Sequence, residues 1–314
     1  MSQPPSPSDD ALLALAQAIR SSGYHFTTPT PATHARINAR PENAWASDLR
    51  GIFGWSRPFR ADVLGPGHLA LMQAAGIVEP HGDGWRSLVR LSTLSGLLFL
   101  HSAYPTTAPD SVFFGPDTYR FARAIEAHLE RRAPPIHRAA DIGCGAGPGA
   151  ILLARALPGA EIFALDINPA ALRLTRLNAA LAGVPVTAQR SDLLAGVDGA
   201  FDLIVANPPY LVDPAARAYR HGGGALGAGL SLDIVRTARD RLAPGGTLLL
   251  YTGVAIVNGH DAFRETATAQ LAAQDLDWSY EEVDPDVFGE ELAEGAYRHA
   301  DRIAAVVLTA RNRR

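Results

Sequence analysis

Four consecutive residues carry the most specific chemical pattern of the chain: Asn207, Pro208, Pro209 and Tyr210. They follow the apolar run FDLIVA, which predicts a buried strand. Because two prolines fix the backbone after this strand, the Asn207 side-chain oxygen and the Pro208 carbonyl are expected to face out from the sheet edge as acceptors. Such acceptors suit the N–H bonds of an amide or an aromatic amine, whose delocalised lone pair must be oriented toward an electrophile. The pattern favours a site that holds a planar nitrogen over a plain proline-rich turn.

A glycine-rich turn, DIGCGAG, follows an earlier apolar strand and leads into a helix expected to begin near Pro148. Glycines at this spacing let the backbone turn sharply and approach a ligand closely, so a nucleotide-like cofactor is the expected occupant. The dinucleotide pattern G-x-G-x-x-G fails because Pro148 occupies the position of the third glycine, which disfavours NAD. The residues of this turn with a candidate role are Asp141, Gly143, Cys144, Gly145 and Gly147.

Two more acids are expected at the ends of the next strands. Asp166 lies 25 residues beyond Asp141, where a carboxylate can accept both hydroxyls of an adenosine ribose. Asp192 follows the third strand and is expected to meet an adenine edge. Either acid alone is more simply a solvated strand-end residue or a helix cap. Three acids at successive strand ends around one glycine turn favour a cofactor site instead.

Cys144 is the single cysteine, so it cannot form an internal disulfide. It is expected to be a small apolar filler of the glycine turn. No cluster of His, Cys and Asp at metal-ligand spacing surrounds it, and no metal is therefore predicted.

The elements that must position these residues alternate between strand and helix from residue 138 onward. This alternation predicts an α/β domain with a seven-stranded, mostly parallel Rossmann-like sheet and helices on both faces. Strands are expected near 138–143, 161–167, 186–191, 201–206, 247–252, 277–283 and 303–309, and helices near 148–157, 169–182, 229–242 and 260–273.

A smaller α+β domain is expected before this sheet. Helical patterns near 44–53 and 66–75 precede two β-compatible runs around the turn signature His81-Gly82-Asp83-Gly84, which suggests a winged-helix-like fold. Pro134-Pro135 punctuates the entry to the second domain. The predicted organisation is a disordered tail over 1–10, a winged-helix-like domain over 11–104, a linker and cofactor-covering segment over 105–137, and the α/β domain over 138–314.

Composition excludes several classes of protein. The chain has 314 residues, 47% hydrophobic and 19% charged, and its 28 basic residues are all arginine against 32 acids. Residues 1–110 hold eight arginines and eight acids, which disfavours a basic nucleic-acid-binding domain, although Arg86 and Arg90 near the hairpin argue locally the other way. With no apolar run of membrane-spanning length and no signal-peptide pattern, the chain is expected to be cytoplasmic, with no membrane contact.

Over residues 105–314 the chain resembles the class I S-adenosylmethionine-dependent methyltransferases, in the amino-methylating branch that carries an NPPY motif. The stretch YRHGGGALGAGLSLDIVRTARDRLAPGGTLLLYTG is similar to the segment after NPPY in the release-factor glutamine methyltransferases, and SVFFGPDTY is similar to their cofactor-covering segment. The N-terminal region differs, since it does not read as the helical bundle of the bacterial enzymes. A triglycine stretch at 222–224, beside His221, is either a lid over the substrate mouth or a plain surface loop.

The resemblance implies S-adenosylmethionine as cofactor and a role for each matching residue. Gly143, Gly145 and Gly147 would pass under its methionine portion, and Asp141 would face the amino group. Asp166 would hold the ribose and Asp192 the adenine. The other residues implied at the cofactor are Cys144, Ile167, Leu193, Asn207, Phe114 and Thr118, and those implied at the acceptor nitrogen are Asn207, Pro208 and Tyr210.

Three substrates remain open. The first is a glutamine side chain of a protein or peptide, which the neutral N-terminal domain favours. The second is an exocyclic base amine of RNA or DNA, which the winged-helix pattern favours. The third is a small metabolite. A non-enzymatic binding module is disfavoured because it would not need an intact NPPY motif, and the sequence does not indicate the oligomeric state.

Overall fold

The computed structural model describes residues 6–131, 135–217, 219–272, 276–293 and 295–313. Residues 1–5 of the predicted tail and Pro134 of the predicted domain boundary lie outside these ranges. Among the residues that are described, no helix is both long and apolar enough to cross a bilayer.

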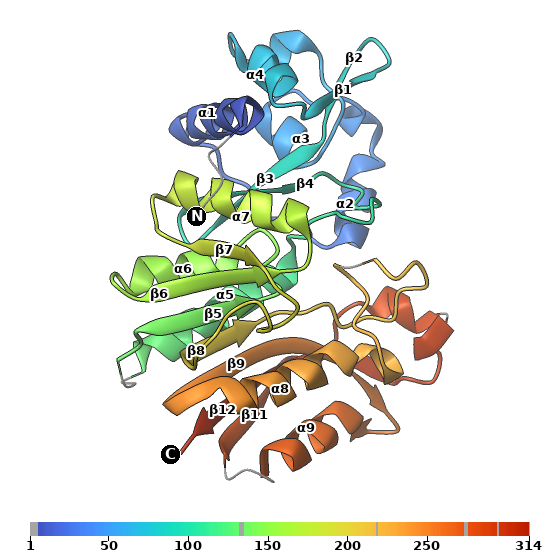
Figure 1. The fold of residues 1–314 in the computed structure, drawn as a ribbon. Helices are drawn as coiled ribbons and strands as arrows, with labels where there is room; N and C mark the ends of the chain where they lie inside the picture. Colours follow the sequence, from blue (N-terminus) through green and yellow to red (C-terminus); the bar gives the residue numbers. More distant parts are fainter. Residues whose placement is uncertain (1–5, 132–134, 218, 273–275, 294, 314) are drawn as a thin grey trace.

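The centre of the molecule is a twisted, mixed sheet (Figure 1) in the order β11-β12-β9-β8-β5-β6-β7, with the short strand β10 on β9. The strands from β9 to β7 pair in parallel, and β12 runs antiparallel to both β9 and β11. The predicted mostly parallel Rossmann-like sheet is therefore confirmed. Its strands are β5 (Arg138–Ile142), β6 (Glu161–Asp166), β7 (Thr187–Arg190), β8 (Phe201–Ala206), β9 (Leu242–Val257), β10 (His260–Asp261), β11 (Leu276–Asp284) and β12 (Arg302–Asn312).

Helices cover both faces of the sheet because its central strands are apolar on both sides. Along β8, Leu203 and Val205 pack with one group of helices, whereas Ile204 and Ala206 pack with the other. The first group is α5 (Pro116–Glu130), α6 (Pro148–Ala156) and α7 (Pro169–Ala182), and the second is α8 (Gly229–Arg241) and α9 (Ala262–Ala272). Short 3₁₀ segments lie in the connections: η3 (Ala225–Gly227), η4 (Gly289–Ala293) and η5 (Gly295–Tyr297).

Local signals fix where α7 begins and ends. The Asn168 side chain accepts a hydrogen bond from the amide of Ala170 (2.9 Å), and Pro169 occupies the first turn, where its missing N–H costs nothing. Gly183 ends the helix in the left-handed conformation, at φ 71°. The helix therefore starts directly after the strand that ends at Asp166.

The N-terminal part contains helices followed by two hairpins, β1–β2 and β3–β4. Its first helix begins at Pro7, inside the segment that the sequence predicts as a tail, because Ser6 and Asp9 form a reciprocal capping box. The winged-helix description stays a prediction. The elements are α1 (Pro7–Ser21), α2 (Pro31–Asn38), η1 (Pro41–Asn43), α3 (Leu49–Phe53), η2 (Ala61–Val63), α4 (His68–Ala74), β1 (Val78–His81), β2 (Gly84–Ser87), β3 (Val89–Leu94) and β4 (Leu97–Ser102).

Helix α7 joins this N-terminal part to the sheet (Figure 1). Its Asn178, which is fully buried, accepts a hydrogen bond from the Leu100 amide on β4 (2.8 Å) and donates to the Leu100 carbonyl (2.9 Å). The same amide group donates to the carbonyl of Ala146 in the glycine-rich turn (2.8 Å). One side chain thus fastens the edge of β4 to the loop at the carboxyl end of β5.

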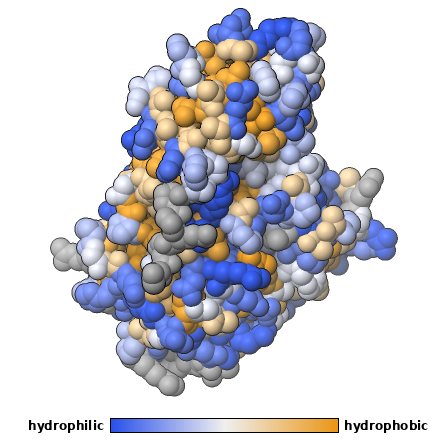
Figure 2. All heavy atoms as spheres, turned by 45° about the horizontal axis from the view of Figure 1, so that its top comes forward, coloured by the Kyte–Doolittle hydropathy of each residue, from blue (hydrophilic) through white to orange (hydrophobic). Residues whose placement is uncertain are grey.

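Arg86 and Arg90, the two arginines that argue locally for nucleic-acid binding, lie in different environments. Arg90 lies on β3 with 5% of its surface exposed, and Arg86 on β2 donates to the Tyr104 carbonyl (3.0 Å). Arg90 is therefore not available as a surface charge, whereas Arg86 is half-exposed. In the space-filling view, hydrophobic residues gather over the upper, N-terminal part of the visible face (Figure 2).

We expect Asn178→Ala to lower the free energy of unfolding by about 2–4 kcal/mol, because it leaves buried backbone groups of Leu100 and Ala146 without partners. The measurement is a urea unfolding curve followed by circular dichroism. Arg176→Ala, at an exposed position on the same helix, is the matched control and should change stability by less than about 0.5 kcal/mol. Equal losses in the two variants would contradict a special role for Asn178.

Candidate active site

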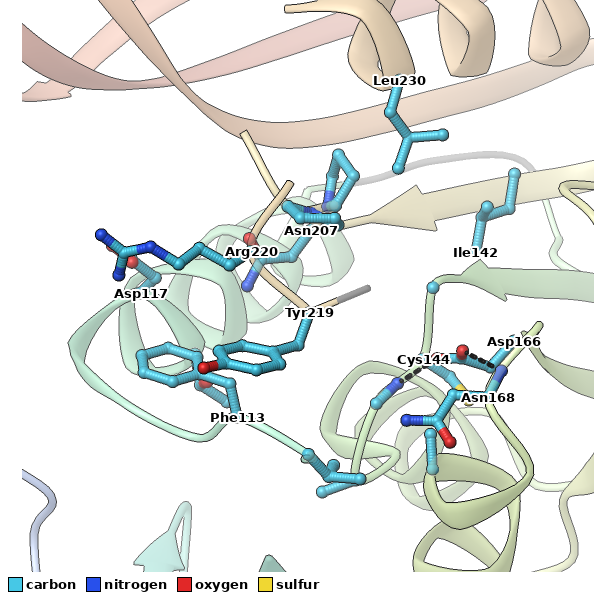
Figure 3. Close-up of a pocket in the computed structure, with 18 of the residues that line it drawn as sticks. Phe113, Asp117, Ile142, Cys144, Asp166, Asn168, Asn207, Tyr219, Arg220 and Leu230 are labelled. Carbon is cyan, nitrogen blue, oxygen red and sulfur yellow. Dashed lines mark hydrogen bonds between the residues drawn. The ribbon is translucent and has the colours of Figure 1, made fainter. Parts of the chain in front are cut away.

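A cavity of about 230 Å³ opens at the carboxyl ends of the parallel strands, which is where ligands bind in open α/β sheets. Figure 3 shows Asp166, Cys144 and Asn168 on one side of it, and Asp117, Phe113, Tyr219 and Arg220 on the other, with Asn207 next to Arg220. The predicted site residues that line it are Asp141, Gly143, Cys144, Gly145, Asp166, Ile167, Asp192, Leu193, Thr118, Asn207, Pro208 and Tyr210.

The glycines of the turn serve two different ends. Gly143 has φ +68°, and a Cβ built on it meets no atom within 4 Å, so its backbone faces the open cavity. Gly147, which the resemblance implies at the cofactor, is not among the residues that line the cavity. A Cβ there would lie 2.8 Å from the Thr175 side chain, so this glycine is required by the close packing of the turn against α7.

Two carboxylates lie beside the turn, the buried Asp141 and the half-buried Asp166. Asp141 accepts a hydrogen bond from the Ala150 amide (2.9 Å), and burial, with the charge of Asp166 nearby, raises its pKa to about 7. Asp166 accepts hydrogen bonds from the amides of Gly145 and Asn168 (both 2.9 Å), and burial raises its pKa as well. A cationic or hydroxyl-bearing ligand would lower the cost of keeping both groups charged.

The neighbours of these acids differ in exposure. Ile167 is 53% exposed although it is a large apolar residue, and Asp192 is also exposed. Both line the cavity, so a flat, partly apolar ligand would cover the side chain of Ile167. The exposed apolar residue beside a pair of carboxylates fits a nucleoside.

Cys144 is buried, and its sulfur lies 3.5 Å from the Thr175 hydroxyl. Burial raises the pKa of the thiol well above its ordinary value, so it is not a nucleophile at neutral pH. Within the described ranges, no three His, Cys, Asp or Glu side chains could together hold a metal. The interpretation of Cys144 as a packing residue agrees with both observations.

The acceptor side is built around the end of β8. Within the described chain no residue hydrogen bonds to the Asn207 side chain, which lines the cavity beside Arg220 (Figure 3). Tyr210 is buried, and its hydroxyl donates to Asp117 (2.7 Å). A Cβ at Gly253 would lie 2.1 Å from the Tyr210 ring, so glycine is needed for that ring to lie against β9.

Asp117 was not predicted as a site residue. Its second oxygen accepts from the Tyr251 hydroxyl (2.7 Å), and Arg120 lies 3.3 Å from the same carboxylate. Burial raises the pKa of Asp117, against the lowering effect of the two tyrosine hydrogen bonds. The consequence is that the Tyr210 hydroxyl is already engaged, so this residue presents its ring to the cavity.

Two further residues that the sequence did not predict, Tyr219 and Arg220, line the cavity from the loop after NPPY. An ion pair between Arg217 and Asp213, which we call the clasp, holds this loop in place. Arg217 donates two hydrogen bonds to the buried carboxylate of Asp213 (2.8 and 2.6 Å), which holds the pKa of Asp213 well below its usual range. Arg220 forms an ion pair with Glu291. In the sequence, the one signal for these residues is the run RAYR, which places two arginines and a tyrosine shortly after the NPPY motif.

The cofactor-covering segment is only partly as expected. Thr118 lines the cavity as expected. Phe114 does not, although the preceding residue, Phe113, does. Phe114 instead stacks on His101 in the N-terminal part, with ring centroids 4.9 Å apart. Successive residues of an extended segment point in opposite directions, so only one of the two phenylalanines can face each side.

The triglycine stretch packs directly on the NPPY motif. The amide of Gly222 donates to the Leu211 carbonyl (2.8 Å), and the amide of Leu230 donates to the Gly222 carbonyl (2.7 Å). A Cβ at Gly222 would lie 2.7 Å from the Pro209 carbonyl oxygen. Close backbone approach explains this glycine, and the lid stays a prediction.

Residues 121–255 match the family model described as "Methyltransferase small domain". The release factor glutamine methyltransferase of Deinococcus radiodurans is 38% identical over 148 residues, which cover 43% of this chain and 51% of that protein. A 4-amino-L-phenylalanine/4-methylamino-L-phenylalanine methyltransferase of Streptomyces pristinaespiralis is 34% identical over 152 residues, 44% of this chain and 52% of that protein. The chain thus spans about half the length of the first curated relatives that it matches.

One relative is matched over most of its length. The release factor glutamine methyltransferase of Bordetella pertussis is 32% identical over 197 residues, which cover 56% of this chain and 72% of that protein. The solved structure of Trm5b from Pyrococcus abyssi has a TM-score of 0.50 at 15% identity and covers 74% of this chain and 62% of that one, which supports the fold alone. The chain therefore belongs to the family of S-adenosylmethionine-dependent methyltransferases that includes the release factor glutamine methyltransferases.

Proposed function

We propose that this protein transfers the methyl group of S-adenosylmethionine to a planar nitrogen, most simply the side-chain amide of a glutamine in a protein or peptide. One observation carries the proposal: Asn207, with no side-chain partner among the described residues, lines the same cavity as the glycine turn and the carboxylates of Asp141 and Asp166. The names of the Deinococcus and Bordetella relatives support the glutamine substrate, and the proposal includes the cytoplasmic location expected from the sequence.

The cofactor residues keep their expected roles in this proposal, with Gly147 and Phe114 removed. Asp141 would pair with the amino group of the methionine portion, above the backbone of Gly143 and Gly145. Asp166 would accept the ribose hydroxyls. The adenine would lie over Ile167, whose exposed side chain it would cover, with Asp192 and Leu193 beside it.

The chain's own contribution to the reaction is orientation. Bound S-adenosylmethionine supplies a methyl group already activated by a sulfonium, so no strong base is required. The Asn207 oxygen and the Pro208 carbonyl hold the two N–H bonds of the acceptor, which aims its lone pair at the methyl group. The Tyr210 ring, fixed through Asp117, forms a wall that excludes water from this end of the cavity.

A second candidate substrate is a small aromatic amine. The rings of Phe113 and Tyr219 line the acceptor side of the cavity, where they would flank a planar group. The Streptomyces relative is named as a methyltransferase of 4-amino-L-phenylalanine, which is such an amine. A nucleic-acid base is less favoured, because Arg90 is buried and cannot pair with a surface phosphate.

Incubating the protein with a fractionated cell extract and S-adenosylmethionine labelled in its methyl group distinguishes these substrates. We expect the label in the protein fraction, and we expect acid hydrolysis to release it as methylamine, because hydrolysis of an N-methylated glutamine amide frees that amine. Label in nucleic acid or in small molecules would instead select the other candidates. The Asn207→Ala variant serves as the negative control.

Asn207→Ala should lower the rate of methyl transfer by about 10² to 10³, the usual cost of losing one oriented hydrogen bond in a transition state. Binding of S-adenosylhomocysteine, measured by calorimetry, should hardly change. Asn207→Asp keeps an acceptor oxygen at the same reach and should retain more activity than Asn207→Ala. Wild-type turnover by Asn207→Ala, with cofactor bound, would contradict the proposed orientation of the nitrogen.

Cofactor affinity should rise with pH up to about 7. Asp141 has a pKa of about 7 in the free protein, so below this pH it must lose a proton to pair with the cofactor's ammonium, and affinity should change by up to about tenfold per pH unit. Because this pKa is raised by folding, the same group lowers the stability of the free protein as pH rises toward 7. Calorimetry of S-adenosylhomocysteine across this range is the measurement.

Asp141→Asn should bind S-adenosylhomocysteine more weakly and remove this pH dependence. The exposed residue Asp198 provides the control, since Asp198→Asn should keep the wild-type slope. A slope that persists in Asp141→Asn would assign the titration to another group.

A further inference from the structure

Arg90 is a buried cation without a carboxylate partner. Its Nε donates to the Gly54 carbonyl (2.9 Å), but its buried Nη2 has no hydrogen-bond acceptor. None of the described Asp or Glu side chains forms an ion pair with it, and the ionisable groups that influence it most are the phenols of Tyr24, Tyr104 and Tyr119. This contrasts with Arg217, whose guanidinium is matched by Asp213.

Such an arrangement is costly for the protein by itself. Burial lowers the pKa of Arg90 to about 10, yet an arginine stays charged at neutral pH. A buried charge without a paired anion is unfavourable unless something else supplies the missing acceptor. The position of the unpaired nitrogen therefore indicates where an anionic group would be stabilised.

A small cavity of about 20 Å³ lies at this position, and we call it the Arg90 cavity. It is lined by Thr28, His34, Arg90, His101, Tyr104 and Phe114, among others. Holding one water takes about 10–15 Å³ on this measure, so the cavity has room for one or two oxygen-sized atoms. The two oxygens of a carboxylate suit that space better than the three free oxygens of a phosphate ester.

A second unpaired group lies in the same cavity. His34 is 1% exposed, its Nε2 bonds to the Trp55 carbonyl (2.8 Å), and its Nδ1 has no partner. His101 differs, since both of its ring nitrogens are bonded, to Ser92 and Ser102. A carboxylate would accept a hydrogen bond from the open donor of Arg90. Burial and the charge of Arg90 lower the pKa of His34 to about 4 in the free protein, and the negative charge of a bound carboxylate would oppose both effects and favour a ring that also donates from Nδ1.

The Arg90 cavity adjoins the acceptor side of the main cavity. Pro31, Thr106 and Phe113 line both. The Tyr219 hydroxyl donates to the Thr106 carbonyl (2.5 Å), so the loop after NPPY is fastened to the shared wall. The shared wall of Pro31, Thr106 and Phe113 separates the two cavities. A methyl acceptor whose nitrogen lies at Asn207 could therefore place a second group at Arg90 by extending past this wall.

We propose that the Arg90 cavity is a carboxylate subsite, through which the N-terminal part of the chain recognises the methyl acceptor. The role in recognition depends on the proposed methyl transfer, whereas the binding of a carboxylate does not. The carboxylate would come either from a small amine-bearing acid or from a peptide, as its C-terminus or an acidic side chain.

The direct test is titration of the full-length protein with sodium acetate, followed through the Nε–H signals of arginine in ¹H–¹⁵N spectra. Ionic strength is held constant with sodium chloride, and the Arg90 signal is assigned from its loss in Arg90→Lys. We expect acetate to give a saturable shift of this signal, and acetamide, which has the same shape without the charge, to give none. A shift with inorganic phosphate but not acetate, no saturable shift with either, or equal shifts with acetate and acetamide would each overturn the proposal.

Variants test the same site by calorimetry with acetate. Arg90→Met and His34→Gln should each weaken acetate binding by about tenfold or more, since each removes a charge-assisted hydrogen bond. Binding of S-adenosylhomocysteine in the main cavity should be preserved and shows that a variant is folded. If Arg90→Met does not fold, His34→Gln decides alone, and wild-type acetate affinity in that variant would overturn the two-donor site.

Transfer assays separate the sources of the carboxylate and isolate this proposal from the proposed function. Glutamine-containing peptides are compared with and without C-terminal amidation, and with an acidic side chain replaced by its amide. 4-Aminophenylalanine is compared with its carboxamide. We expect the acid in one of these series to show a KM lower by about tenfold or more, with kcat less affected. If acetate binds but no methyl transfer occurs, the proposed function and the subsite's role in recognising the acceptor are both overturned, and carboxylate binding stands. If transfer occurs with the same KM for every acid and its amide, only the role in recognition is overturned.

Discussion

The direction of the strands is the constraint on which the rest of this structure depends. Because β5, β6, β7 and β8 run parallel, their carboxyl ends meet at one edge of the sheet, and the chain must cross back over the sheet between successive strands, most often through a helix. Each crossover places a loop at that edge, and residues far apart in sequence, such as Asp141 and Asn207, come to line one cavity. The shared direction of the strands thus decides where the polar side chains of the site can meet.

The features that could be predicted from the sequence are those with a strong local cause. The sheet, its order of strands and helices, and the cavity residues after each strand follow from periodicity, glycines and prolines. Sequence spacing does not reveal which residues of a turn or an extended segment face the cavity: Gly147 packs against Thr175 and the Phe114 ring stacks on His101, so neither lines it. Asp117 could not be recognised because its partners, Tyr210 and Tyr251, lie 93 and 134 residues away.

The chain contains arginine but no lysine. Two of its arginines lie near the site in different environments. In the clasp, the planar fork of Arg217 meets both oxygens of Asp213 and fixes a loop. Arg90 is held by one backbone carbonyl and the face of Phe26, 5.7 Å from its guanidinium carbon. The Arg217 guanidinium is thus matched by a carboxylate, whereas the Nη2 of Arg90 is buried without a hydrogen-bond acceptor.

The amide of Asn178 has a consequence for how this protein can evolve. A recognition domain that is joined to a catalytic domain by a linker alone can be exchanged for another while the catalytic domain stays as it is. Here the strand edge of the N-terminal part and the glycine turn share one side chain, and α7 contributes to a core that is continuous with α1 and β4. Replacing the N-terminal part would therefore require a new α7 surface at the same time, so substrate range in this lineage is expected to change by substitution within the domain rather than by shuffling of domains.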